Sequence, residues 1–239
     1  MADTTNLVSH WKLNEGSGTR VDSHTNSYDL ADNNTVTSRT GKIDDAASFD
    51  DDNSEFLSKT SETFLEIGSS EYRIDMWVML DDKVGRMFLV SKGAAGAGNI
   101  EFRIDYDDSG DRFRFLVQNS GDTGTTSVSA NTFGSPSIGV WIFLSCRHDP
   151  TGNVIGIQVN DTTEDTAAHS ANVNSGGHPL EFGCVNAGVL CLDGGLDSIS
   201  IWKGGTPGAT HAELYNSGDG LDYPYSSDVR KRVHTFVMG

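Results

Sequence analysis

One nine-residue segment, YRIDMWVML, limits what this chain can fold into more than any other part of the sequence. It places an apolar side chain at every second position from Tyr72 to Leu80, with Arg73, Asp75 and Trp77 on the opposite side. Side chains alternate between two faces in a β-strand, so this period of two predicts a strand with one face in a core. A helix with the same residues would scatter the apolar side chains around its axis.

Similar segments recur along the chain and are separated by turn-forming residues. Sequences such as DDSGD and DPTGN favour tight reversals, and the chain has 27 glycines against 5 prolines. Regularly spaced strands and turns predict an all-β protein whose antiparallel sheets pack face to face. The segments predicted as strands are residues 7–13, 72–80, 86–92, 99–107, 111–119, 125–130, 140–149, 153–161, 179–185 and 196–202.

Two other segments predict local features. DAASFDDDNSEFLSK has apolar pieces around Phe49 and Phe56 that are joined by an acidic turn, which predicts a hairpin. THAELYNSG is the only helix-like piece: Thr210 can cap it, Glu213 has capping-box spacing, and Gly218 is expected to end it.

The chain of 239 residues predicts a single domain with a short tail. It has 36% hydrophobic residues, enough for one packed core, and no linker rich in Pro or Ser. The sandwich is expected to occupy residues 1–225. Residues 226–239 are expected to form a final strand or arm, because three basic residues precede an apolar stretch there.

The charge of the chain excludes some partners. With a formal net charge of −17, it should repel nucleic acid and anionic membranes. No apolar run approaches the roughly 18 residues that cross a bilayer, and the chain starts without a signal-peptide pattern, so we expect synthesis in the cytoplasm. Cys146, Cys184 and Cys191 are an odd set without metal-ligand spacing, and we predict that they are reduced and buried.

The order of the pieces resembles the laminin G-like domains of the concanavalin A-like superfamily over roughly residues 7–225. LVSHWKLNEGSGTRVDS is similar to the first strand and loop of that family, GKIDDAASFDDDNSEFLS to the next hairpin, and YRIDMWVML with FLVSKG to the middle strand pair. VWIFLSCRHDPTGNVIGIQVND resembles the pair that ends on an exposed turn, and LDGGLDSISIWKGG with HAELYNSGDG resembles the closing strand and helix. The resemblance implies a single antiparallel jelly-roll sandwich.

The same resemblance suggests a calcium site. It implies Asp22 in the N-terminal loop and Asp197 in the closing strand as ligands, although this chain has Ser198 where the family typically has a second acid. The turn Asp50–Asn53 is a second candidate from composition, without the ligand spacing of an EF-hand. An acidic surface that only confers solubility is the alternative.

Two further sets of residues could carry chemistry. Trp77, Arg73 and Asp75 share a strand face and combine an aromatic ring with polar groups, as a sugar-binding sheet does; alternatively Trp77 belongs to the core. Asp105 and Asp107 share a face with Glu101, but residues two apart on a strand are about 7 Å apart, so Glu101 and Asp105 are too distant for a retaining glycosidase. We therefore predict that the chain is not an enzyme.

Two non-enzymatic hypotheses remain, with a glycoside hydrolase as a distant third. In the first, the protein is a structural or decorating component of a virus or phage particle that faces outward and binds host glycans. Its partners would be glycans, proteins of the capsid or tail, and further copies of itself. In the second, it is a free carbohydrate-binding lectin.

Overall fold

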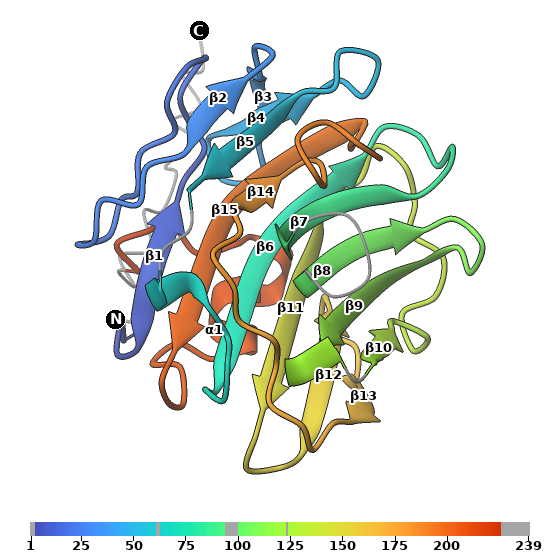
Figure 1. Ribbon diagram of the computed structural model, residues 1–239. Helices are drawn as coiled ribbons and strands as arrows, with labels where there is room; N and C mark the ends of the chain where they lie inside the picture. Colours follow the sequence, from blue (N-terminus) through green and yellow to red (C-terminus); the bar gives the residue numbers. More distant parts are fainter. Residues whose placement is uncertain (1–2, 61–62, 94–99, 123, 226–239) are drawn as a thin grey trace, which may run out of the picture.

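The computed structural model describes residues 3–60, 63–93, 100–122 and 124–225, which form two antiparallel β-sheets packed face to face (Figure 1). The front sheet, nearer the viewer, has the strand order β10-β9-β8-β7-β14-β5-β2. The back sheet has the order β13-β12-β11-β6-β15-β4-β3, and β1 also pairs with β15. This architecture confirms the predicted all-β sandwich with one short helix near residue 210.

The front sheet consists of β2 (Ala31–Asn33), β5 (Phe56–Lys59), β7 (Met87–Gly93), β8 (Ile100–Asp107), β9 (Arg112–Gln118), β10 (Thr125–Ser129) and β14 (Leu180–Phe182). The back sheet consists of β1 (Leu7–Trp11), β3 (Thr37–Thr40), β4 (Asp45–Phe49), β6 (Tyr72–Leu80), β11 (Ile142–Asp149), β12 (Val154–Val159), β13 (Asp165–Ala168) and β15 (Gly194–Lys203). The helical elements are η1 (Thr63–Leu65), η2 (Ser120–Asp122), α1 (His211–Tyr215) and η3 (Asn216–Gly218).

The main core fills the space between the sheets. As the alternation predicted, every second residue of β6 from Tyr72 to Leu80 is buried in this core. On the front sheet, the same period places Phe102 and Ile104 of β8 and Phe113 and Phe115 of β9 in it. Each such side chain contributes about 1.5–3 kcal/mol when it leaves water, so this two-residue period accounts for much of the driving force that closes the sandwich.

The predicted hairpin around Phe49 and Phe56 is wrong. β4 pairs with β15 and β3 in the back sheet, whereas β5 pairs with β14 and β2 in the front sheet. The acidic turn between them is therefore a crossing from one sheet to the other. Two short strands joined by a turn have the same local pattern in both arrangements, because only their distant partners differ.

A second apolar cluster covers the outer face of the back sheet. Trp77, Phe143 and Trp202 of this sheet pack there against Leu214 of α1 and Tyr225. The predicted capping box is confirmed, since Glu213 N donates to Thr210 Oγ1 and Thr210 N donates to the Glu213 carboxylate. The helix ends at Tyr215, earlier than predicted, because Asn216 adopts the left-handed conformation.

Two remaining predictions concern the ends of the chain and membranes. The proposed tail, residues 226–239, lies outside the described residues. Among the residues that are described, no helix is long and apolar enough to cross a membrane.

Candidate functional site

The predicted sugar-binding residues lie beneath α1 and the segment that follows it. Trp77 is 2% exposed, and its ring packs against Phe143 and Tyr215 with centroid distances of 5.1 and 5.9 Å. A sugar stacks on a ring only where a ring face is open. Trp77 therefore offers no stacking surface unless the segment containing Tyr215 moves away.

Asp75 and Arg73 take part in a buried network in the same place. The Asp75 carboxylate accepts hydrogen bonds from Arg73 Nε at 2.9 Å, Ser145 Oγ at 2.6 Å and Trp202 Nε1 at 2.7 Å. Arg73 also donates to the carbonyl of Ala209 at 2.6 Å, just before α1. These contacts join the back sheet to its cover, so the structure brings the three predicted residues together as a buried cluster and not as an open face.

Asp22, the first predicted calcium ligand, is fully engaged by protein donors. Its carboxylate accepts from Ser9 Oγ and from the backbone N–H groups of His10, His24 and Tyr28, at 2.9–3.1 Å. These bonds explain why an acid is needed at this position, since they hold the N-terminal loop against β1. A carboxylate that already accepts four hydrogen bonds does not fit the role of a calcium ligand.

Asp197, the second predicted ligand, has a different environment. It is fully buried, one oxygen accepts the N–H groups of Lys42 and Ile43 at 2.7 and 2.8 Å, and the other has no hydrogen-bond partner. Burial raises the pKa of Asp197 to about 7. Calcium takes six to eight oxygen ligands, and the described part of the chain has no group of three His, Cys, Asp or Glu side chains that could hold a metal. The hydrogen-bond donors of Asp22 and those of Asp197 are different residues, so the two carboxylates do not form one calcium-binding group.

The acidic turn is also organised by its own hydrogen bonds. Asp50 accepts from Asp52 N at 3.0 Å and from Asn53 Nδ2 at 2.9 Å, and Asp50 N donates to Glu55 at 3.1 Å. Side chains of Asp and Asn often stabilise turns in this way. The cluster of acids is thus accounted for by the sheet-to-sheet crossing.

The front sheet presents a different outer face, which sequence reasoning did not identify as a site. Opposite positions of β8 and β9 form cross-strand rows: Asp107 with Arg112, Asp105 with Arg114, and Arg103 with Leu116. Arg103, Arg112, Arg114 and Leu116 are partly exposed. Serines of β10 extend two of these rows, Ser127 beside Leu116 and Ser129 beside Arg114. We call the set Arg86, Arg103, Asp105, Asp107, Arg112 and Arg114 the arginine face.

Asp105 is at the centre of the arginine face. It is 1% exposed and receives two hydrogen bonds from Arg114, from Nε at 3.0 Å and Nη2 at 2.5 Å. Arg86 lies 3.7 Å from the same carboxylate and also pairs with Asp107. Burial raises the pKa of Asp105, and Arg114 and Arg86 oppose that shift. A bidentate pair fixes the plane of the Arg114 guanidinium, so this face is rigid before any ligand arrives.

Arg103 completes the face. Its guanidinium carbon lies 5.3 Å from the centre of the Phe88 ring, in cation–π contact. Burial lowers the pKa of Arg103, and the neighbouring Arg114 and Arg86 lower it further, against the opposite effect of Asp105. Three guanidinium groups are therefore held near one another in a chain of net charge −17.

Glu101 does not belong with these carboxylates, although the sequence pattern placed it on their face. Its carboxylate pairs with Lys92 Nζ at 3.0 Å and accepts the N–H of Ile67. Both members of this pair are at most 1% exposed, and Lys92 also donates to the carbonyls of Gly176 and His178 at 3.3 and 3.2 Å. The register of β7 and β8 is irregular at Lys92 and Gly93, which breaks the simple alternation.

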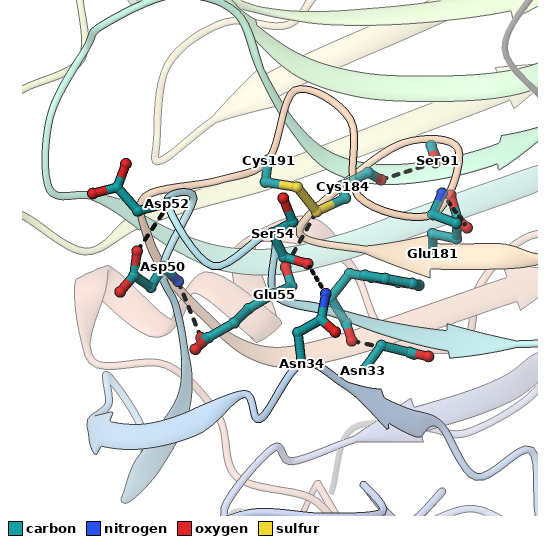
Figure 2. The surroundings of a disulfide bond; sticks show 12 residues. Asn33, Asn34, Asp50, Asp52, Ser54, Glu55, Ser91, Glu181, Cys184 and Cys191 are labelled. Carbon is teal, nitrogen blue, oxygen red and sulfur yellow. Dashed lines mark hydrogen bonds between the residues drawn. A yellow bond between two sulfur atoms is a disulfide. The ribbon is translucent and has the colours of Figure 1, made fainter.

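A disulfide-closed loop borders the arginine face. Cys184 and Cys191 are bonded, which contradicts the predicted reduced state; only Cys146 is free, and it is buried. In Figure 2 the disulfide lies between the acidic turn, with Glu55, and β14, with Glu181. Cys184 Sγ is 3.2 Å from the carbonyl oxygen of Glu55.

The loop is connected to the strands beside it. Ser91 of β7 donates to the carbonyl of Cys184 at 3.1 Å, and Ala187 N donates to Glu181 at 3.0 Å (Figure 2). Phe88 N donates to the carbonyl of Leu190 at 2.9 Å. The disulfide therefore holds the loop against the strand that supplies Phe88.

The fold and its two unlike faces define the class of protein: a jelly-roll sandwich that covers the outer face of one sheet and leaves the other polar and partly exposed. The family model described as the concanavalin A-like lectin/glucanases superfamily matches residues 41–206. The chain belongs to this superfamily, as the resemblance to laminin G-like domains predicted. No curated protein sequence matches the chain.

Several solved structures share the fold. Domain 4 of AbnA, an extracellular arabinanase from Geobacillus stearothermophilus, was solved with arabinotriose; it matches with a TM-score of 0.59 and 18% identity over 85% of this chain and 95% of that one. The binding domain of Paraclostridial Mosquitocidal Protein 1 matches with a TM-score of 0.65 and 14% identity, over 86% of this chain and 50% of that one. Trypanosoma rangeli sialidase matches with a TM-score of 0.62 and 13% identity, over 92% of this chain and 34% of that one. At these identities the likeness concerns the fold alone.

Proposed function

We propose that the chain is a non-catalytic carbohydrate-binding module and that the arginine face is its binding surface. The observation that carries the proposal is that two arginines of this face are held in place. Arg114 is held by its hydrogen bonds to Asp105, and Arg103 is held by its cation–π contact with Phe88. Sugar recognition uses such pre-positioned donors and acceptors, because each hydroxyl offers both kinds of hydrogen bond. The lectin-like fold and the arabinotriose complex of the AbnA domain support the same class of ligand.

The state of the carboxylates supports a binding role over hydrolysis. A retaining glycosidase needs two carboxyl groups about 5 to 5.5 Å apart, one of them able to give a proton. Asp105 and Asp107 are both paired with arginine, and Glu101 contacts a separate set of residues. We therefore expect sugar to be bound and released unchanged.

A set of exposed apolar side chains supports a second element of the proposal, a protein partner. The loops that carry them are hydrogen-bonded, through Gly139 N to Leu80 O at 2.8 Å and Asp81 N to Asp193 O at 3.0 Å. Exposed apolar groups gathered on adjoining loops are typical of interaction sites. These side chains are Val84, Ile138, Val140, Val189 and Leu190.

We propose on this basis that the module decorates the surface of a larger particle, such as a virion, where it adheres to glycans. The alternative is a free lectin. Deletion of residues 228–239 distinguishes them: a decorating protein should lose incorporation into the particle and keep glycan binding. Under the free-lectin alternative neither the full chain nor the deletion variant should be incorporated into a particle, and both should bind glycans.

A glycan array with site-directed blocking tests the binding surface. Ser127 and Ser38 are exposed serines on β10 of the front sheet and β3 of the back sheet. Each is changed to cysteine and coupled to a bulky maleimide, while the native free thiol, Cys146, is buried. We expect the label at position 127 to abolish binding and the label at position 38 to leave it unchanged. Equal effects, or no binding to any glycan, would contradict the proposal.

A further inference from the structure

The segment that follows β13, residues 169–174, links the two sheets (Figure 1). His169 N donates at 2.8 Å to the carbonyl of Asn153, in the turn between β11 and β12 of the back sheet. Asn174 N donates at 2.7 Å to the carbonyl of Gln118, the last residue of β9 in the front sheet. We call residues 169–174 the clasp segment, because its backbone is bonded to both sheets.

Two buried histidines meet at the start of the clasp segment. His148, on β11, is 0% exposed, and His169 is 3% exposed. Their ring centroids lie 5.4 Å apart in an edge-to-face arrangement, with 71° between the ring planes. His169 Nδ1 lies 3.1 Å from Thr126 Oγ1 on β10, the edge strand of the front sheet. The histidine pair therefore joins the back sheet to the edge of the front sheet.

The hydrogen bonds of His148 define its protonation state. Its Nδ1 lies 2.7 Å from the carbonyl oxygen of Ser70, which can only accept, so Nδ1 carries the hydrogen. Its Nε2 is buried and has no hydrogen-bond partner among the described residues. A second proton would have to go to Nε2, where it would create a buried charge and a buried donor without an acceptor. The closed segment therefore favours a neutral His148.

The electrostatic surroundings favour the neutral form of both rings. Burial lowers the pKa of His148, while its bond to the Ser70 carbonyl and the nearby Asp149 oppose this shift. Burial also lowers the pKa of His169, and His148 lowers it further, whereas the backbone of Ala171 opposes the shift. Protonation of both rings would place two positive charges in contact, in addition to the cost of burying each.

The remaining titratable and charged groups near the pair lie on the side of His148. Tyr72 of β6 is the cross-strand neighbour of His148, and the β10 neighbour of His169, Thr126, is uncharged. Both arginines near His148 are paired with other acids, Arg147 with Glu164 and Arg73 with Asp75. A small cavity that His148 lines is also lined by Glu71, Arg73, Arg147 and Asp149.

We propose that His148 and His169 form an acid-sensitive clasp between the two sheets. At pH 7.5 the neutral pair holds the clasp segment in place, and at pH 5 protonation releases it. A released histidine with the ordinary pKa of 6.5 takes up a proton at pH 5, which shifts the opening equilibrium by up to about 30-fold for each ring. The closed state is thus fully stable above about pH 6.5 and loses stability as the pH falls below it. This inference does not depend on the proposed function.

Residue-resolved hydrogen exchange tests the clasp in the intact protein. The measured quantity is the protection factor, the ratio of intrinsic to observed exchange rate at the same pH. We expect the protection of the His169 and Asn174 amides to fall at least about tenfold from pH 7.5 to pH 5. The amide of Ile74, on the central strand β6, should change less than about twofold in the same sample. An equal fall at Ile74 would indicate acid unfolding of the whole fold and would overturn the clasp.

The test variant combines His148→Gln and His169→Gln, which removes both titrating rings and keeps polar side chains. Its matched control is His178→Gln, which replaces a partly exposed histidine on the same connection between β13 and β14. We expect the amides of the clasp segment in the test variant to change less than about threefold between the two pH values, and those of the control to change as in wild type. Equal pH sensitivity in wild type and the test variant would contradict the proposal.

A second measurement needs no variant. A titration of the histidine ring protons of wild type by nuclear magnetic resonance follows the protonation of His148 and His169 directly. We expect both rings to remain neutral at pH 6.5 and to take up protons in the same pH range in which the clasp segment loses protection. Protonation of either ring at or above pH 6.5 with the segment still protected would overturn the proposal.

Discussion

At the scale of single residues, Asp75 shows how a polar group can hold a β-sandwich together. Its carboxylate is 1% exposed and accepts from β6, β11 and β15 through Arg73, Ser145 and Trp202. A buried charge is tolerated only when donors surround it. Arg73 and Asp75, the polar residues of YRIDMWVML, therefore stabilise the folded structure through buried hydrogen bonds. The sequence alone was also compatible with a sugar-binding role for them.

We expect Asp75→Ala to lower the free energy of unfolding by about 3 to 5 kcal/mol, because Arg73 then remains buried without its partner. Urea denaturation measures this loss. Asp52→Ala, in the exposed acidic turn, is the control and should change stability by less than about 0.5 kcal/mol. A loss below 1 kcal/mol for Asp75→Ala would show that the network contributes little.

Glu101 makes stability depend on pH. Burial raises its pKa from 4.5 to about 7, although Lys92 opposes the shift. Because the folded state holds the proton more tightly, the contribution is complete below pH 4.5 and is lost as the pH rises through 7. We expect wild type to lose of order 2 kcal/mol relative to Glu101→Gln between pH 5 and pH 8.

Urea denaturation of both proteins at the two pH values measures this difference. From pH 5 to pH 8 the free energy of unfolding of wild type should fall relative to that of Glu101→Gln, because only wild type has to ionise this buried carboxyl. Glu71→Gln is a control on the adjoining surface. A gap that is constant with pH would contradict the role assigned to Glu101.

At the scale of elements, the loop closed by Cys184 and Cys191 should depend on its disulfide. The bond limits the conformations of the unfolded chain, and for a loop this short it contributes about 2 kcal/mol. We expect a reductant to lower the unfolding temperature of wild type to that of the Cys184→Ser, Cys191→Ser double variant. The intact mass of wild type should be two hydrogens below the reduced value.

The double variant should be insensitive to the reductant. A wild-type mass equal to that of the reduced chain, or an unfolding temperature that the reductant leaves unchanged, would contradict the disulfide. Because the loop borders β7 and Phe88, glycan binding should also weaken when the bond is broken.

At the scale of the whole molecule, the outer faces of the two sheets differ in how far they are buried. The cover formed by α1 and Tyr225 buries the outer face of the back sheet over its middle strands β6, β11 and β15, whereas the arginine face remains partly exposed. The first strand and the closing strand pair directly, β1 with β15. Asp22 supports this junction by holding the N-terminal loop to His10 of β1.

A calcium titration tests this view of the whole fold. We expect 1 mM calcium to raise the unfolding temperature no more than 1 mM magnesium does, since Asp22 is saturated by protein donors. Asp197→Asn is the control. Stabilisation by calcium in wild type that disappears in Asp197→Asn would instead establish a calcium site at the closing strand.

The sequence by itself determined the fold class, the clearest strands and the cap of α1, because these depend on the period of neighbouring side chains and on local hydrogen bonds. Only the tertiary structure decided that β4 and β5 belong to different sheets, that Cys184 and Cys191 meet, and that Trp77 is covered. The arginine face was also hidden in the sequence, since its arginines come from β8, from β9 and from the position just before β7. Pairing between distant segments creates such a face, and no local pattern specifies that pairing.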